Sequence, residues 1–197
     1  MNRILRRALV AASSLGVAGG IALTALPASA AISPVASWGA EAFGPIHFGP
    51  VAFATFYNTP QAASNANYTN FLTTGRIIDR ASRTTSYSLV NSPLVNLSFL
   101  QATVSADQVT SWCHTFGQFT VGGAAVFNGS VSQIDGISYN PLRHPAPNTT
   151  VNINNFTSVT FNYQSVFNGI RHVAAIVVRS GPETLYLGNS RCSVRLT

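Results

Sequence analysis

The sequence contains no lysine, and few of its residues carry a charge of either sign. Only 8% of the 197 residues are charged. A protein that binds nucleic acid by releasing counterions needs basic side chains gathered on one surface. The eight arginines after residue 30 are instead spread along the chain, and with five acidic residues they leave a net charge of +3. We therefore expect no nucleic-acid partner.

Long apolar runs are absent except near the N-terminus. There, three arginines precede an apolar stretch that ends at Leu26, and Ala28-Ser29-Ala30 supplies the small residues that a signal peptidase recognises. This pattern predicts a signal peptide over residues 1–30. It also predicts a chain that is secreted to the extracellular space and that is able to associate with the cell surface. No later segment has the roughly 20 apolar residues of a membrane helix, so we expect no integral membrane span in the mature chain.

Cysteine is scarce, with only Cys113 and Cys192 in the sequence. An even number of cysteines in an exported chain indicates a disulfide bond. A bond between these two would close a loop of about 80 residues and stabilise the fold by roughly 4 kcal/mol in the chain-entropy model. A catalytic thiol beside His114 is disfavoured, because neighbouring residues on a strand point to opposite faces.

Motifs that carry catalysis or bind metals are also missing. The four histidines form neither a His-x-His pair nor a His-Glu-x-x-His motif, and no glycine-rich phosphate loop occurs. Among the acidic residues, Asp135 lies in an Asp-Gly turn and Glu183 follows Gly-Pro, so both have structural explanations. We predict that the protein is not an enzyme and uses no metal or cofactor.

Short segments with period-two alternation fill the chain from Thr85 onward. Residues 159–167 alternate apolar with polar side chains, residues 173–178 are apolar throughout, and Asn168-Gly169 between them is a hairpin signal. We predict one strand over 94–105, either with a bulge near Phe99-Leu100 or buried on both faces, and a turn at Gly188-Asn189. Together these features predict an all-β fold, with residues 31–197 forming a single antiparallel β-sandwich or jelly-roll-like domain.

Two tryptophans are the aromatic residues of most interest. We expect Trp112 to pack on the disulfide bond of its neighbour Cys113. Trp38 lies near the predicted mature N-terminus and is the candidate ligand-binding residue, because an exposed aromatic ring is a stacking platform for sugars.

Several segments of the C-terminal half follow a familiar order. Residues 147–153 (PNTTVNI), 159–164 (VTFNYQ), 173–178 (VAAIVV) and 188–192 (GNSRC) resemble the choice-of-anchor P family of exported bacterial proteins. Residues 38–44 and 119–124 fit the same pattern loosely. Tyr163 stands where that family has glutamate, and 174–177 replace its Asn-Ala-Leu-His. The resemblance implies a secreted or surface β domain without an assigned biochemical role, and it transfers no catalytic residue.

These observations lead to two functional hypotheses. The first is a secreted, non-enzymatic structural or interaction protein of the bacterial cell surface or extracellular matrix, which contacts a cell-envelope component or self-associates through sheet faces and edges. The second is a module that binds carbohydrate or another envelope polymer.

Overall fold

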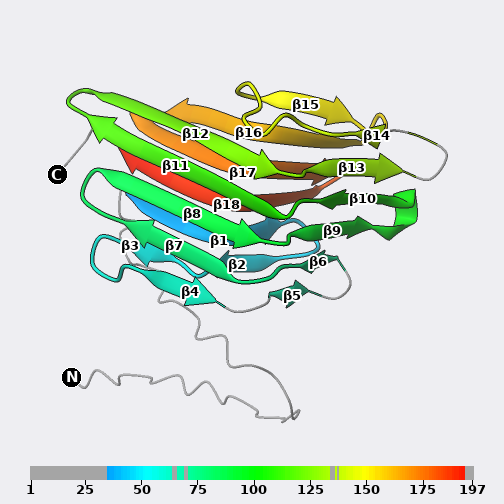
Figure 1. Cartoon of the computed structure of the whole chain (residues 1–197), viewed down its shortest axis with the longest axis horizontal. Helices are drawn as coiled ribbons and strands as arrows, with labels where there is room; N and C mark the ends of the chain where they lie inside the picture. The colour runs from blue at the N-terminus through cyan, green and yellow to red at the C-terminus, as the bar shows by residue number, and fades with distance from the viewer. Residues whose placement is uncertain (1–34, 64–65, 69–70, 134–135, 137, 194–197) are drawn as a thin grey trace, which may run out of the picture. The chain divides into compact units, whose positions relative to one another are not determined.

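The computed structural model describes residues 35–63, 66–68, 71–133, 136 and 138–193. The predicted signal peptide over residues 1–30 lies outside these described residues. The described part is all-β and forms a single domain of antiparallel sheets packed as a sandwich, which confirms the predicted fold class. Figure 1 shows the strands in their two layers.

One layer is sheet A, which is built around the C-terminal strands. In order across the sheet, its strands are β15 (Thr149–Asn152), β16 (Thr157–Phe167), β17 (Ile170–Ser180), β18 (Glu183–Ser193), β1 (Ala36–Phe43) and β2 (Phe48–Val51), and β3 (Ala54–Thr55) also pairs with β1. The Asn168-Gly169 hairpin between β16 and β17 is present, with positive φ at both residues. Every side chain from Val173 to Val178 is buried, as predicted for a central strand.

The second layer contains sheets B and C. Sheet B consists of β12 (Phe119–Phe127), β11 (Gln108–Phe116), β8 (Thr85–Asn91), β7 (Ile77–Ala81) and β4 (Gln61–Ala63). Sheet C consists of β14 (Ser138–Tyr139), β13 (Ser130–Gln133), β10 (Ala102–Ser105), β9 (Leu94–Leu97), β6 (Leu72–Thr73) and β5 (Asn67–Tyr68). Sheet B packs face to face on sheet A, with β11 and β8 over β18 and with β12 over β17.

Sheets B and C are in line and share one strand register. Gln108 pairs with Phe127 in sheet B, and Ser105 pairs with Ser130 in sheet C, which is the register expected if both strands ran straight through. The strands of sheet B are separated from those of sheet C by short breaks, at 92–93 between β8 and β9 and at 106–107 between β10 and β11. These two breaks lie side by side, because the amide of Ser92 donates to the carbonyl of Asp107 at 2.7 Å. The sandwich is therefore two-layered, and one layer is interrupted along a line that crosses its strands.

Two local predictions are wrong. Residues 94–105 do not form one strand, because the 3₁₀ turn η1 (Ser98–Leu100) and a left-handed Gln101 reverse the chain between β9 and β10. Gly188 does not begin a turn. It has a φ of +61° and lies inside β18, which keeps the same register with β17 on both sides of it, and a side chain there would press on Ala175 of β17.

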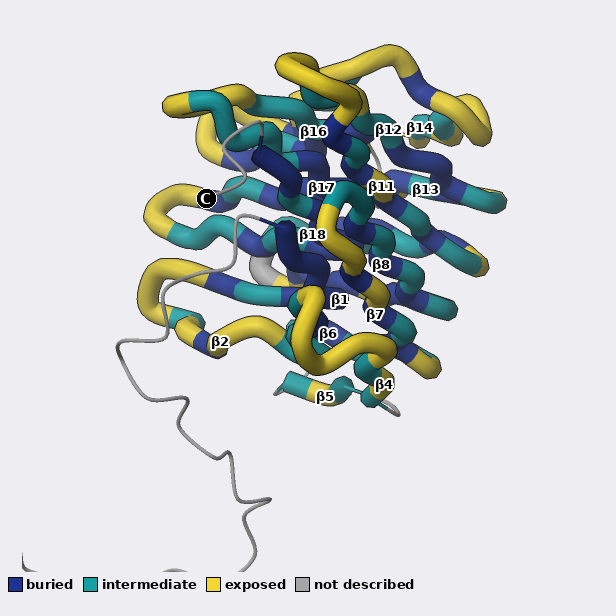
Figure 2. The backbone as a smooth tube through the Cα atoms, turned by 90° about the vertical axis from the view of Figure 1, so that its left-hand side faces the viewer, coloured by how far each residue is buried: buried dark blue, intermediate teal, exposed yellow. Residues whose placement is uncertain are grey.

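The interior of the sandwich changes character along its length. Apolar side chains fill the part beneath sheet C and the strand breaks, including Val95, Leu97, Val104 and Phe161. Beneath the outer half of sheet B, the buried residues include many serines, together with both cysteines. Figure 2 shows the buried strands at the centre and the exposed turns around them.

Candidate functional site

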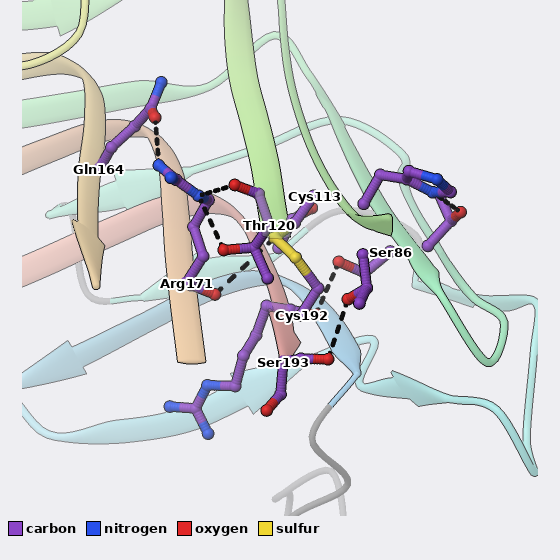
Figure 3. The surroundings of a disulfide bond; sticks show 12 residues. Ser86, Cys113, Thr120, Gln164, Arg171, Cys192 and Ser193 are labelled. Atoms are coloured by element: carbon purple, nitrogen blue, oxygen red, sulfur yellow. Dashed lines mark hydrogen bonds between the residues drawn. A yellow bond between two sulfur atoms is a disulfide. The ribbon is translucent and has the colours of Figure 1, made fainter. Parts of the chain in front are cut away.

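The predicted disulfide bond is present and links the two layers. Cys113 on β11 and Cys192 on β18 are both fully buried, and their Cα atoms are 5.6 Å apart. Figure 3 shows the bond between the layers, with Ser86 beside it and Arg171 nearby. The Arg171 guanidinium donates to Thr120 of β12 and to the side-chain oxygen of Gln164 at 2.9 Å. This end of the sandwich is therefore held by one covalent and several polar contacts.

A row of buried hydroxyl groups crosses from one layer to the other around the disulfide bond. We call this row the serine seam, and it consists of Ser37, Ser86, Ser88, Ser111, Thr115 and Ser190. Its hydroxyls donate to main-chain carbonyls of the facing layer at 2.9–3.2 Å, and Ser111 donates to the Ser190 hydroxyl. Because each buried hydroxyl has a partner, the seam is compatible with a stable interior.

Sequence reasoning missed the serine seam. Alternation in β8 would place the larger Tyr87 and Leu89 inside, but these side chains are only half-buried, and Ser86 and Ser88 face the interior. The signal was present as small residues at alternate positions of both β8 and β11. Small side chains let the layers approach closely, and a Cβ on Gly39 would collide with the Ile77 side chain.

A carboxylic acid lies in the same interior. Asp79 on β7 is fully buried, and neither of its oxygens has a hydrogen bond of good geometry. Burial raises the pKa of Asp79 to about 8, although the nearby Ser88 hydroxyl and Gly39 amide act in the opposite direction. At neutral pH the side chain is mostly protonated, so the interior carries little charge there.

The expectation that Trp38 is exposed is wrong. Trp38 lies on β1 opposite Asn189 and is only 4% exposed. Its neighbours Ser37 and Gly39 face sheet B, so its ring lies on the opposite face of sheet A, where Phe53 covers it with ring centroids 6.1 Å apart. The burial arises because the chain after β2 folds back onto this face, a long-range feature that position in the sequence does not reveal.

Trp38 belongs to a group of packed rings on that outer face. We call this group the ring cluster, and it consists of Trp38, Tyr163, His172 and Tyr186. His172 is central, with centroid distances of 5.5 Å to Trp38, 6.0 Å to Tyr163 and 5.5 Å to Tyr186. The four rings come from the neighbouring strands β16, β17, β18 and β1, so the cluster extends across sheet A.

Polar groups surround the ring cluster. His172 Nε2 lies 3.0 Å from the Asn189 side-chain oxygen, and burial lowers the pKa of His172 to about 4. The Arg191 guanidinium stacks over the Trp38 ring at 5.5 Å. Burial raises the pKa of Glu41, while the Trp38 indole and the charge of Arg191 oppose that effect.

Three buried hydrogen-bond donors in this region form no bond of good geometry among the described residues, although the Trp38 indole lies near the Glu41 carboxylate. They are Trp38 Nε1, Asn189 Nδ2 and Arg191 Nε. Buried donors are normally paired, so three on one face of the sheet are unusual. All three donor atoms are buried, so the part of the ring cluster that reaches solvent includes the half-buried rings of Tyr163 and Tyr186.

The expectation for Trp112 is also wrong. Trp112 does not pack on the disulfide bond, because it is next to Cys113 on β11 and points to the opposite face of sheet B, where it is 41% exposed. Side chains alternate between the two faces of a strand, so Trp112 and His114 both lie on the face opposite Cys113. Its ring lies over Gly123 of the neighbouring strand, which has no side chain to displace it.

Exposed apolar side chains gather at two hairpin tips. We call them the apolar rim: Phe116 and Phe119 flank the β11–β12 turn, and Val166 and Phe167 precede the β16–β17 turn. Phe116 and Phe119 are each 73% exposed, and Phe167 is 76% exposed. The two hairpins meet where Arg171 contacts Thr120 at 3.1 Å, so the rim lies at one end of the sandwich, to the left in Figure 1.

Other chemistry is sparse in the part of the chain that the structure describes. There, no group of three His, Cys, Asp or Glu side chains is placed to hold a metal ion. Over the same residues, no helix has the length and apolar character needed to cross a bilayer.

Comparison with family models, with curated proteins and with solved structures gave no match. The resemblance to the choice-of-anchor P family therefore stays a prediction.

Proposed function

We propose that the chain is a secreted, non-enzymatic interaction protein of the bacterial cell surface or extracellular matrix, which works by contact with an envelope component. The apolar rim is the observation that carries this proposal. Several large exposed apolar side chains at one end of a folded domain favour an interaction surface more than isolated exposed residues do. Here Phe116, Phe119 and Phe167 project from hairpin turns at one end of the sandwich.

The N-terminal sequence and the disulfide bond support an extracellular location. The pattern over residues 1–30 is that of a signal peptide, and buried disulfide bonds persist in oxidising compartments. The resemblance to exported bacterial proteins points to the same place. A stable sandwich then serves as a rigid support for the rim.

Binding to isolated envelope tests the proposal. The purified chain should sediment with envelope fragments, and the double variant Phe116→Ser/Phe167→Ser should sediment about tenfold less. Phe156→Ser is the matched control, because Phe156 is 79% exposed and lies just before β16, at the opposite end of the strand from Phe167. A strict monomer in light scattering that binds no envelope fraction would contradict the proposal.

The second candidate function is binding of a carbohydrate or another envelope polymer at the ring cluster. The half-buried rings of Tyr163 and Tyr186 favour it, because the apolar faces of sugars stack on aromatic rings. Tyr186→Ala should weaken binding to a glycan array, whereas Tyr87→Ala, on the other layer, should not. Trp38 is unsuitable for this test because its substitution would open the packed face.

A further inference from the structure

The apolar rim consists of turns that project rather than of a flat face. The β11–β12 hairpin turns at Gly117, where an added Cβ would meet no atom within 4 Å. The β16–β17 hairpin turns at Asn168-Gly169, with Val166 and Phe167 immediately before it. Phenylalanine side chains on narrow turns are able to insert into a soft, deformable partner. They match the flat surface of a rigid partner less well.

The charges near the rim are all of one sign. The β7–β8 turn carries the exposed Arg83 and adjoins the rim, because the amide of Thr115 donates to the carbonyl of Thr84 at 2.7 Å. Arg171 lies between the two rim hairpins. Of the carboxylates in the described residues, none lies on these three hairpin turns.

The acidic residues that the structure describes lie elsewhere. Glu183 begins β18 at the opposite end of the sandwich and accepts from the amide of Ile46 at 2.9 Å. Asp107 lies at the line of strand breaks, and Asp79 is buried in the interior. Glu41 lies on β1, where it pairs with Tyr186 of the ring cluster. The rim end therefore combines apolar side chains with unopposed positive charge.

We infer that the apolar rim docks on an anionic lipid bilayer, with Phe116, Phe119 and Phe167 in the interfacial region and Arg83 against lipid phosphates. Aromatic and apolar side chains beside basic residues are the composition of peripheral membrane contacts. Rim-to-rim contact between two copies would bring arginines of the same sign together, which disfavours that arrangement. The inference rests on the proposed function and names its partner.

Vesicle sedimentation tests the inference directly. The chain should sediment with vesicles of phosphatidylcholine and phosphatidylglycerol, and about tenfold less with phosphatidylcholine alone. Phe116→Ser/Phe167→Ser should abolish sedimentation, and Phe156→Ser should leave it unchanged. Arg83→Gln should lower the affinity about fivefold, which corresponds to about 1 kcal/mol for one basic residue near an anionic surface.

Fluorescence provides a readout of insertion. A Phe167→Trp variant should show a blue shift in emission with the anionic vesicles, and brominated lipid should quench it. A Phe156→Trp variant should show neither effect.

The outcomes separate the lipid from other partners. Binding to envelope fragments without binding to vesicles would overturn the lipid inference and leave the proposed function standing. Equal binding to both vesicle types, or binding that the rim variants do not weaken, would also overturn it. A dimer that the rim variants dissociate would assign the rim to a second copy, and failure with vesicles and envelope alike would remove both proposals.

Discussion

Ser111 on β11 donates a hydrogen bond to Ser190 on β18 across the interior of the sandwich, with 2.8 Å between the two hydroxyl oxygens. Both side chains are fully buried. The two layers are therefore joined here by a polar contact that depends on both partners. This contact gives the first prediction.

Ser111→Ala should lower the free energy of unfolding by about 1–3 kcal/mol, because it leaves the Ser190 hydroxyl buried without its partner. Urea denaturation measures the change. Ser132→Ala is the control, since Ser132 makes a similar bond of 2.9 Å to Thr103 on the exposed surface. Equal losses in the two variants would show that burial of the pair does not matter.

Removal of the disulfide bond should cost more. The variant Cys113→Ala/Cys192→Ala should lose roughly 4 kcal/mol of unfolding free energy, because the unfolded chain regains the freedom of a loop that spans 79 positions. Denaturation in the absence and presence of a reductant gives the comparison. If the wild type were as stable reduced as oxidised, the bond would contribute nothing to the fold.

Asp79 should make the protein less stable as the pH rises from about 4 to about 8. The unfolded chain releases this proton near the ordinary pKa of 3.8, whereas the folded chain keeps it up to about 8. Between these values the folded state binds more protons, so its free energy of unfolding falls with increasing pH. Asp79→Asn should remove this pH dependence, which unfolding curves at several pH values measure. If the Asp79→Asn variant kept the same pH dependence, Asp79 would not be its source.

His172 should act in the opposite direction. Its pKa is lowered from 6.5 to about 4 in the folded protein, so the unfolded chain takes up a proton first as the pH falls. The free energy of unfolding therefore decreases as the pH falls from about 6.5 to about 4. His172→Gln should flatten this part of the stability profile, and the exposed His144→Gln should not. An unchanged profile in His172→Gln would contradict the prediction.

Local signals in the sequence predicted the elements whose structure depends on their own residues. Asn168-Gly169 accepts positive φ and produced the expected hairpin, and the unbroken apolar run 173–178 became the buried centre of sheet A. The pairing of Cys113 with Cys192 followed from the count alone.

Features that depend on which face of a strand meets the interior were not predictable in the same way. Trp38 proved buried and Trp112 exposed, the reverse of what was expected, because the face of the sheet on which each ring lies depends on strand alternation and on which segments cover that face. The apolar rim was missed since phenylalanine in a strand pattern normally indicates core. Only the hairpin geometry shows that Phe116 and Phe119 flank a turn.

The pairing of β1 with β18 has a consequence for how the chain reaches its native state. The strand nearest the start of the described chain lies beside the strand nearest its end, and β18 separates β17 from β1. Sheet A is thus incomplete until residues 183–193 have been synthesised, and contacts of such long sequence separation form slowly. A chain lengthening from its N-terminus would stay open until almost its last residues arrive, which leaves time for it to be threaded through a narrow passage before it closes.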